Sequence, residues 1–226
     1  MSPSIAGFLL AAPVILFSMV AHEYAHGYAA LKQGDPTAYQ LGRLTWNPIR
    51  HIDPFMTILL PIFTFYFWHF AFGGAKPVPV NPRNYRNFKR GDIIVSLAGV
   101  ATNFVIAVAF TLLVVLIGLV GRSLPGWVET LALVQIMLVI GIQFNLLLAI
   151  FNLIPIPPLD GSHVVKYLLP PAWALRYQSA GRYGLLIVFA VVFLMPSIFV
   201  VPLQGVFRVA SSVFAPFVLP GVLGPL

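Results

Sequence analysis

The sequence predicts an all-α, polytopic membrane protein with about five to six membrane segments, and three observations support this class. Of the 226 residues, 59% are hydrophobic and only 8% are charged. The mean hydropathy is +0.93, and several charge-free runs exceed the roughly 20 residues that cross a hydrocarbon core. Because soluble domains and disordered chains lack these properties, we expect a single membrane domain over residues 1–226.

The predicted spans follow from the charge-free runs, taken in chain order. Residues 1–21 carry no Lys or Arg, so they lack the basic start of a secretory signal and are interpreted as a retained span. Two antiparallel spans are expected at 93–121 and 130–159, joined by a short polar hairpin. Residues 183–207 form another candidate span with two prolines, and whether the apolar tail at 209–226 crosses stays open.

Residues 55–74 are apolar, rich in aromatic side chains and just long enough to cross a bilayer. A crossing would place the basic residues before and after this segment on opposite sides, against the positive-inside tendency. We therefore expect a re-entrant segment, with both flanking basic loops and the loop at 160–182 on the cytoplasmic side. Residues 39–46 (YQLGRLTW) predict a small strand-like element after the first helix.

The charge distribution excludes several function classes. The net charge of +7 does not indicate nucleic-acid binding, because the basic residues lie in short clusters between apolar runs, where anionic headgroups explain them. The absence of cysteine excludes disulfides and Cys-ligated metal sites. Of the six acidic residues, Glu23 and Asp160 lie in apolar stretches, where an ionisable side chain is costly and normally marks function.

The sequence His-Glu-Tyr-Ala-His at 22–26 ends the first predicted span. On a helix, positions i and i+4 share a face, so His22 and His26 can reach one metal ion, with Glu23 as general base. The structural alternative is a polar cluster that only joins helices. A catalytic zinc site needs a third protein ligand, and Asp160 is the best candidate because the predicted topology places it on the same side as the histidines.

Three motifs, in order, carry a resemblance to a known family: HEYAH at 22–26, SLAGVATN at 96–103 and NLIPIPPLDG at 152–161. Over residues 22–162 they resemble the site-2 protease family of intramembrane zinc metalloproteases, peptidase family M50. The family cleaves transmembrane helices of membrane proteins. The resemblance implies Glu23 as the base and, as ligands of one zinc ion per chain, His22, His26 and Asp160.

The resemblance also carries expectations for other residues. Asn103 matches the polar residue of a family motif and is expected to support the site or the substrate backbone. The strand-like element at 39–46 is expected to pair with unwound substrate. Val100 stands where the family usually has proline, and no PDZ-like insertion is present, which fits the short branch of the family.

The remaining polar residues have weaker assignments. Asn145 and Asn152 lie seven residues apart on one helix face, and they face either the site or a neighbouring helix. His51 is a reserve ligand or a supporting partner, although its segment is better explained as an interfacial turn. His163 is interpreted as polar surface and His69 as structural.

Together these observations predict a multi-pass protein of a prokaryotic cell membrane, with its active site toward the cytoplasm, that hydrolyses a peptide bond within or near a transmembrane helix of a membrane-protein substrate. The alternative is a non-enzymatic membrane protein, either a metal transporter or an inactive protease-like binder of transmembrane segments. A transporter would place polar residues along several spans, whereas here they concentrate near one side. The sequence predicts neither the substrate nor the oligomeric state.

Overall fold

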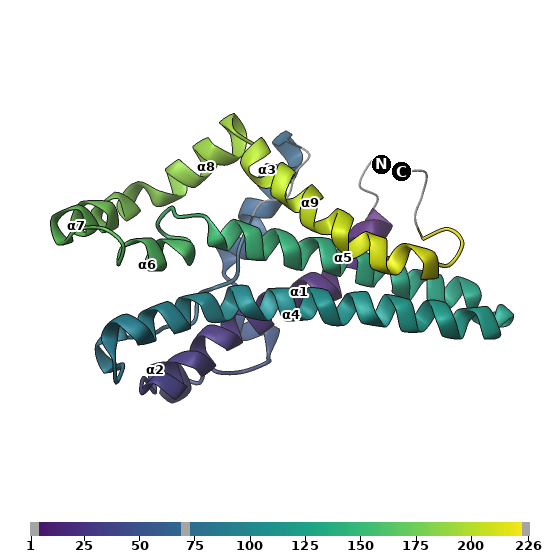
Figure 1. Cartoon of the computed structure of the whole chain (residues 1–226), viewed down its shortest axis with the longest axis horizontal. Coiled ribbons are helices and arrows are strands. Elements are labelled where there is room, and N and C mark those ends of the chain that lie inside the picture. The colour runs from purple at the N-terminus through teal and green to yellow at the C-terminus, as the bar shows by residue number, and fades with distance from the viewer. Residues whose placement is uncertain (1–4, 69–72, 223–226) are drawn as a thin grey trace.

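The computed structural model describes residues 5–68 and 73–222, and this part of the chain is helical with no strand (Figure 1). The prediction of an all-α protein is therefore confirmed. Single turns of 3-10 or π helix lie at Pro48–His51, Pro54–Leu59, Pro82–Asn84, Pro125–Trp127, Ala180–Tyr183 and Ala215–Phe217. The α-helices are α1 (Ile5–Gln33), α2 (Thr37–Gln40), α3 (Leu60–Trp68), α4 (Phe88–Ser123), α5 (Val128–Leu153), α6 (Gly161–Val165), α7 (Pro171–Ser179), α8 (Gly184–Leu194) and α9 (Ser197–Phe214).

Several helical segments are long and apolar enough to cross a membrane. In the described residues there are four of them: Phe88–Ser123, Pro125–Leu153, Pro171–Leu194 and Ser197–Phe217. In addition, α1 has 29 residues, about 43 Å at 1.5 Å per residue. The predicted span at 183–207 is wrong in its bounds, because α8 ends at Leu194 and α9 begins only after Pro196, whose ring and missing N–H do not continue a helix.

The centre of the molecule is formed by α1, α4 and α5, with α9 packed across the last two (Figure 1). The helices α4 and α5 form the predicted antiparallel pair. At Gly141 of α5, an added Cβ would lie 2.5 Å from Cγ1 of Val14 on α1 and 2.6 Å from Cε2 of Phe110 on α4. The absent side chain therefore allows three helices to meet closely, which is a common use of glycine in membrane bundles.

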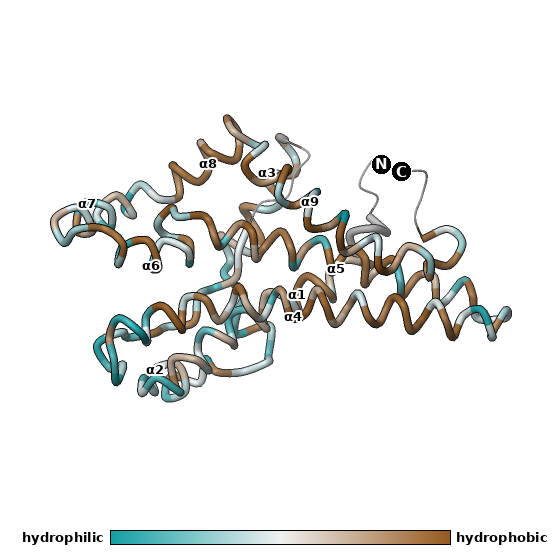
Figure 2. The backbone as a smooth tube through the Cα atoms, viewed as in Figure 1, coloured by the Kyte–Doolittle hydropathy of each residue, from teal (hydrophilic) through white to brown (hydrophobic). Residues whose placement is uncertain are grey.

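Polar and apolar segments are separated along the long axis of the molecule. Figure 2 shows hydrophilic residues gathered at the end of the molecule that carries α2, α7 and the start of α4, whereas most residues of α4, α5, α8 and α9 are hydrophobic. Large apolar side chains on α4 are exposed, including Val105, Leu112 and Leu116. Such a surface is stable in lipid and costly in water.

The segment at 54–68 leaves the bundle, and Gly74 lies beside its first residues. It begins with a π-helical turn at Pro54–Leu59 and continues as α3. Beyond the undescribed residues 69–72, the N–H of Gly74 donates to the carbonyl of Met56 at 3.0 Å, and the Thr57 hydroxyl donates to the carbonyl of Gly74 at 2.7 Å. The two ends of this excursion therefore lie side by side.

The predicted strand at 39–46 is wrong. The first residues of this segment belong to α2, and Gly42 adopts a left-handed conformation with φ 62°, which glycine takes without strain. The N–H groups of Arg43 and Leu44 both donate to the carbonyl of Ala38, at 2.8 and 3.2 Å. The end of α2 thus uses the backbone donors that a strand would offer to a neighbour.

Candidate metal centre

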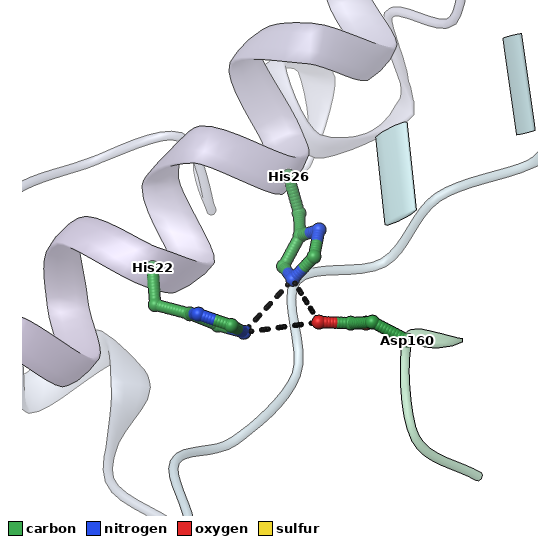
Figure 3. A group of neighbouring side chains, drawn as sticks. All are labelled: His22, His26 and Asp160. Atoms are coloured by element: carbon green, nitrogen blue, oxygen red, sulfur yellow. Dashed lines mark hydrogen bonds and ion pairs between the residues drawn. The ribbon is translucent and has the colours of Figure 1, made fainter. Parts of the chain in front are cut away.

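Three of the predicted site residues converge on one point (Figure 3). His22 and His26 lie one turn apart on α1, and their Nε2 atoms are 3.0 Å apart. Asp160, just before α6, places Oδ2 at 3.4 Å from each of these nitrogens. Among the described residues, no other group of three His, Cys, Asp or Glu side chains comes together in this way.

The turn after α5 brings Asp160 to the histidines. The helix ends at Leu153, and a proline-rich stretch then reverses the chain before α6. A Cβ at Gly161 would overlap the carbonyl of Leu153, so only glycine allows the new helix to begin against the end of the previous one. The carboxylate is held in a partly buried position, with 19% of the side chain exposed.

The donor set fits a divalent metal ion of the zinc type. Oδ2 of Asp160 is buried and accepts no hydrogen bond. Its polar neighbours are the two Nε2 atoms at 3.4 Å, and a cation shared by the three atoms would offset its burial. Nδ1 of His26 lies 2.7 Å from the carbonyl oxygen of Val95. A carbonyl only accepts, so this nitrogen carries a hydrogen, and in the neutral ring the Nε2 lone pair faces the centre. Zinc bonds of about 2.0–2.1 Å place tetrahedral ligands roughly 3.3 Å apart, which matches the separations found here.

A buried polar network lies behind His22. Its Nδ1 is 2.6 Å from Oδ1 of Asn103 on α4, and the Asn103 amide donates to Oδ1 of Asn145 on α5 at 3.1 Å. The Asn145 amide in turn donates to the hydroxyl of Ser18 on α1 at 2.7 Å. Asn103, expected to support the site or the substrate, therefore contacts one of the candidate ligands directly.

Glu23 adjoins His22 in α1, and its side chain is held by the backbone. Its Oε2 accepts the N–H of Val78 at 2.8 Å, whereas Oε1 accepts no hydrogen bond from the described residues. The sequence analysis missed this partner. The signal is the Pro77-Val78-Pro79 order, since proline has no N–H and Val78 carries the single donor in that tripeptide.

Gly99 is a second residue that the sequence analysis missed. A Cβ there would lie 2.5 Å from Cε1 of His22 and 2.5 Å from Nε2 of His26, so the absence of a side chain makes room for both imidazoles. Its signal was the Ala-Gly pair in the motif at 96–103. The next residue, Val100, stands where the site-2 protease family usually has proline. The helix α4 continues through this position without a break.

Two other candidate residues do not join the metal cluster. His51 is buried, and its Nε2 lies 2.9 Å from the carbonyl oxygen of Thr45. The amide of Asn152 donates to the carbonyl of Leu148 in its own helix at 3.0 Å. His69 falls outside the described residues.

His163 belongs to a separate cluster, which we call the Asp92 clamp (Asp92, His163, Lys166 and Tyr167). The carboxylate of Asp92, at the start of α4, lies 3.1 Å from Nδ1 of His163, accepts the Tyr167 hydroxyl at 2.9 Å and pairs with Lys166. Burial and this hydrogen bond to a carboxylate raise the pKa of the Tyr167 hydroxyl above its usual range. The clamp ties the segment that follows Asp160 to α4.

In the described residues, fold and site together define a helical protein with several candidate membrane spans and a His-His-Asp cluster. Glu23 directly follows one of the two histidines in the sequence. The profile of peptidase family M50 matches residues 126–195. The chain is 40% identical over 193 residues to YwhC of Bacillus subtilis (strain 168), which covers 85% of this chain and 83% of that protein. It is 30% identical over 185 residues to Rip2 of Mycolicibacterium smegmatis, and this match covers 80% of this chain and 65% of that protein.

Both relatives are named as zinc metalloproteases. The chain belongs to peptidase family M50. No solved structure matches it. The family membership supports an enzyme and makes zinc the metal that the cluster is expected to hold.

Proposed function

We propose that this chain is an intramembrane zinc endopeptidase that hydrolyses a peptide bond within or near a transmembrane helix of a membrane-protein substrate. In this proposal, His22, His26 and Asp160 hold one zinc ion, and Glu23 is the general base. The observation that carries the proposal is the approach of three potential ligand atoms to 3.0–3.4 Å, one of them from Asp160, which is far from the two histidines in the chain. In the described residues, no hydrogen bond offsets the burial of Oδ2 of Asp160.

The side chains around the site have distinct roles in the proposed hydrolysis. When bound, zinc lowers the pKa of water and polarises a carbonyl group. Glu23 takes the proton from the attacking water through Oε1 and returns it to the leaving amine. The N–H of Val78 holds Oε2 and so keeps the carboxylate beside the site. The Val95 carbonyl holds the ring of His26.

The proposed membrane arrangement follows from the excursion at 54–68. The hydrogen bond from Gly74 to Met56 brings the two ends of the excursion together. This contact supports a re-entrant course with both ends on the same side of the membrane. The basic residues on either side of it then share one face with the loop that carries Asp160. The positive-inside tendency assigns this face to the cytoplasm. In this proposal, residues 1–226 form a single membrane domain, and a helical substrate unwinds locally before its carbonyl reaches the site.

The proposed base is tested by cleavage of a candidate transmembrane substrate in reconstituted bilayers. Wild-type protein is expected to cleave it, and Glu23→Gln to lose nearly all activity while it still binds zinc. Equal activity of the two proteins would exclude Glu23 as the base.

The proposed ligands are tested by metal analysis of the purified protein. Replacing His22, His26 and Asp160 together is expected to abolish bound zinc, whereas His51→Gln, a change to a buried histidine outside the cluster, is expected to retain one zinc per chain. Unchanged metal content in the triple variant would remove the site. Zinc flux into liposomes without proteolysis would instead support the transporter alternative.

A further inference from the structure

A network of three buried polar side chains, Ser18, Asn145 and Asn103, ends at His22 (the His22 network). We infer that Ser18 and Asn145 are positioning residues, which act through Asn103 to fix the hydrogen of the neutral His22 ring on Nδ1 and leave Nε2 free to bind a metal. This inference deepens the proposed function, because it takes Nε2 as a zinc ligand. All three side chains are fully buried, with 0% exposed, so water does not replace any member.

The network is anchored by two backbone carbonyls, which accept hydrogen bonds and never donate. The hydroxyl of Ser18 donates to the carbonyl of Val14 at 2.7 Å, so its oxygen is left to accept. The amide nitrogen of Asn145 donates one hydrogen to this oxygen at 2.7 Å and the other to the carbonyl of Gly141 at 2.8 Å. A flipped Asn145 would place its own oxygen against the Gly141 carbonyl, so only one orientation of this amide is stable.

The orientation of Asn145 then determines the orientation of Asn103. With its nitrogen committed, Asn145 presents Oδ1, which accepts from Nδ2 of Asn103 at 3.1 Å. Asn103 therefore presents its own Oδ1 to Nδ1 of His22, at 2.6 Å. Because an amide oxygen only accepts, Nδ1 of His22 must carry the hydrogen.

This choice of tautomer determines whether the cluster can hold a metal. A hydrogen on Nε2 of His22 would point into the space shared with Nε2 of His26 at 3.0 Å and Oδ2 of Asp160 at 3.4 Å. The carbonyl of Val95 sets the same tautomer in His26 by direct contact. Backbone carbonyls thus determine the tautomer of both histidines. The Val95 carbonyl acts on His26 directly, and the Gly141 carbonyl acts on His22 through the amides of Asn145 and Asn103. Partners of this kind on the second ring nitrogen usually tune metal affinity.

The first test is ¹⁵N NMR of metal-free, histidine-labelled wild-type protein, with the His22 signals identified by their loss in His22→Gln. For the neutral His22 ring, the Nδ1–H tautomer alone is expected. A signal of the Nε2–H tautomer at this residue would overturn the inference. The result depends on neither zinc nor proteolysis, so it is distinguishable from failure of the proposed function, which the zinc content of the wild-type protein reports.

The second test removes the anchor with Asn145→Leu, which frees the Asn103 amide to rotate. We expect a mixture of His22 tautomers and a zinc dissociation constant raised about tenfold or more, the usual effect of losing such a partner. Gln135→Leu is the matched control, since Gln135 is also a fully buried amide on α5 but bonds Val114, Phe217 and Leu219 instead. An equal loss of affinity in both variants would assign the effect to packing and overturn the inference.

The third test is a rescue. Asn103→Asp, added to Asn145→Leu, gives His22 a carboxylate partner that accepts in either orientation. We expect this double variant to return to the Nδ1–H tautomer and to recover most of the lost zinc affinity. If affinity stays low while the tautomer is restored, orientation is not what the network contributes, and the inference fails.

Discussion

At the residue scale, the space around the two imidazoles is set by one missing side chain. Gly99→Ala adds a methyl group at 2.5 Å from both rings, so at least one ring must leave its position. We expect the zinc dissociation constant to rise about tenfold or more, by analogy with other disturbances of ligand orientation. A competition titration against a chelator measures it. Gly126→Ala is the control, because nothing lies within 4 Å of a Cβ there, and equal affinity of the two variants would contradict the prediction.

A second prediction at this scale concerns the backbone donor to Glu23. Val78→Pro removes the N–H that holds Oε2, so the carboxylate is no longer fixed beside the site. We expect kcat to fall by about 10- to 100-fold, since a hydrogen bond to a charged group contributes roughly 1.5–3 kcal/mol, with zinc content unchanged. Val78→Ala keeps the N–H while removing the buried side chain, so it controls for packing. If kcat falls equally in both variants, the loss comes from the packing of the Val78 side chain and not from its N–H, which contradicts the prediction.

At the scale of elements, α6 is short and depends on α4 for its position. The Asp92 clamp joins the start of α4 to residues that follow Asp160 by three to seven positions. Asp92→Asn removes the charge that pairs with Lys166 and leaves an amide to bond Tyr167. We expect zinc affinity to fall several-fold because Asp160 is held less firmly. Asp53→Asn, which changes a helix cap away from the clamp, should leave zinc affinity as in the wild type; equal affinity in both variants would show that the clamp is not needed.

The sequence predicted those elements whose cause is local or carried by composition. The charge-free runs predicted the long helices, and the spacing of His22 and His26 predicted their common face. The strand at 39–46 was wrong because its donors are taken by the end of α2, a contact that pattern alone does not reveal. Gly99 and Val78 were missed because their roles depend on neighbours 73–77 and 55 residues away in the chain, which only the folded structure brings together.

At the scale of the whole molecule, the distribution of charge and the course of the chain support the same orientation. The hydrophilic end in Figure 2 carries the loops around α2 and α7 and the start of α4. The hairpin between α4 and α5 lies at the opposite end of these two helices (Figure 1). The hydrogen bond between Gly74 and Met56 brings the two ends of the excursion together, which favours the proposed re-entrant course.

The absence of cysteine makes this orientation directly measurable with single cysteines and a membrane-impermeant thiol reagent. Ile49→Cys and Phe88→Cys flank the excursion at exposed positions and leave every charge unchanged. If the segment between them is re-entrant, as proposed, we expect both to be labelled from the cytoplasmic side only. Gly126→Cys, in the α4–α5 hairpin, is expected to be labelled from the other side and is the control for sidedness. Labelling of positions 49 and 88 from opposite sides would show that residues 54–74 span the membrane. Val78, which follows this segment, could then not donate its N–H to Glu23 as it does here.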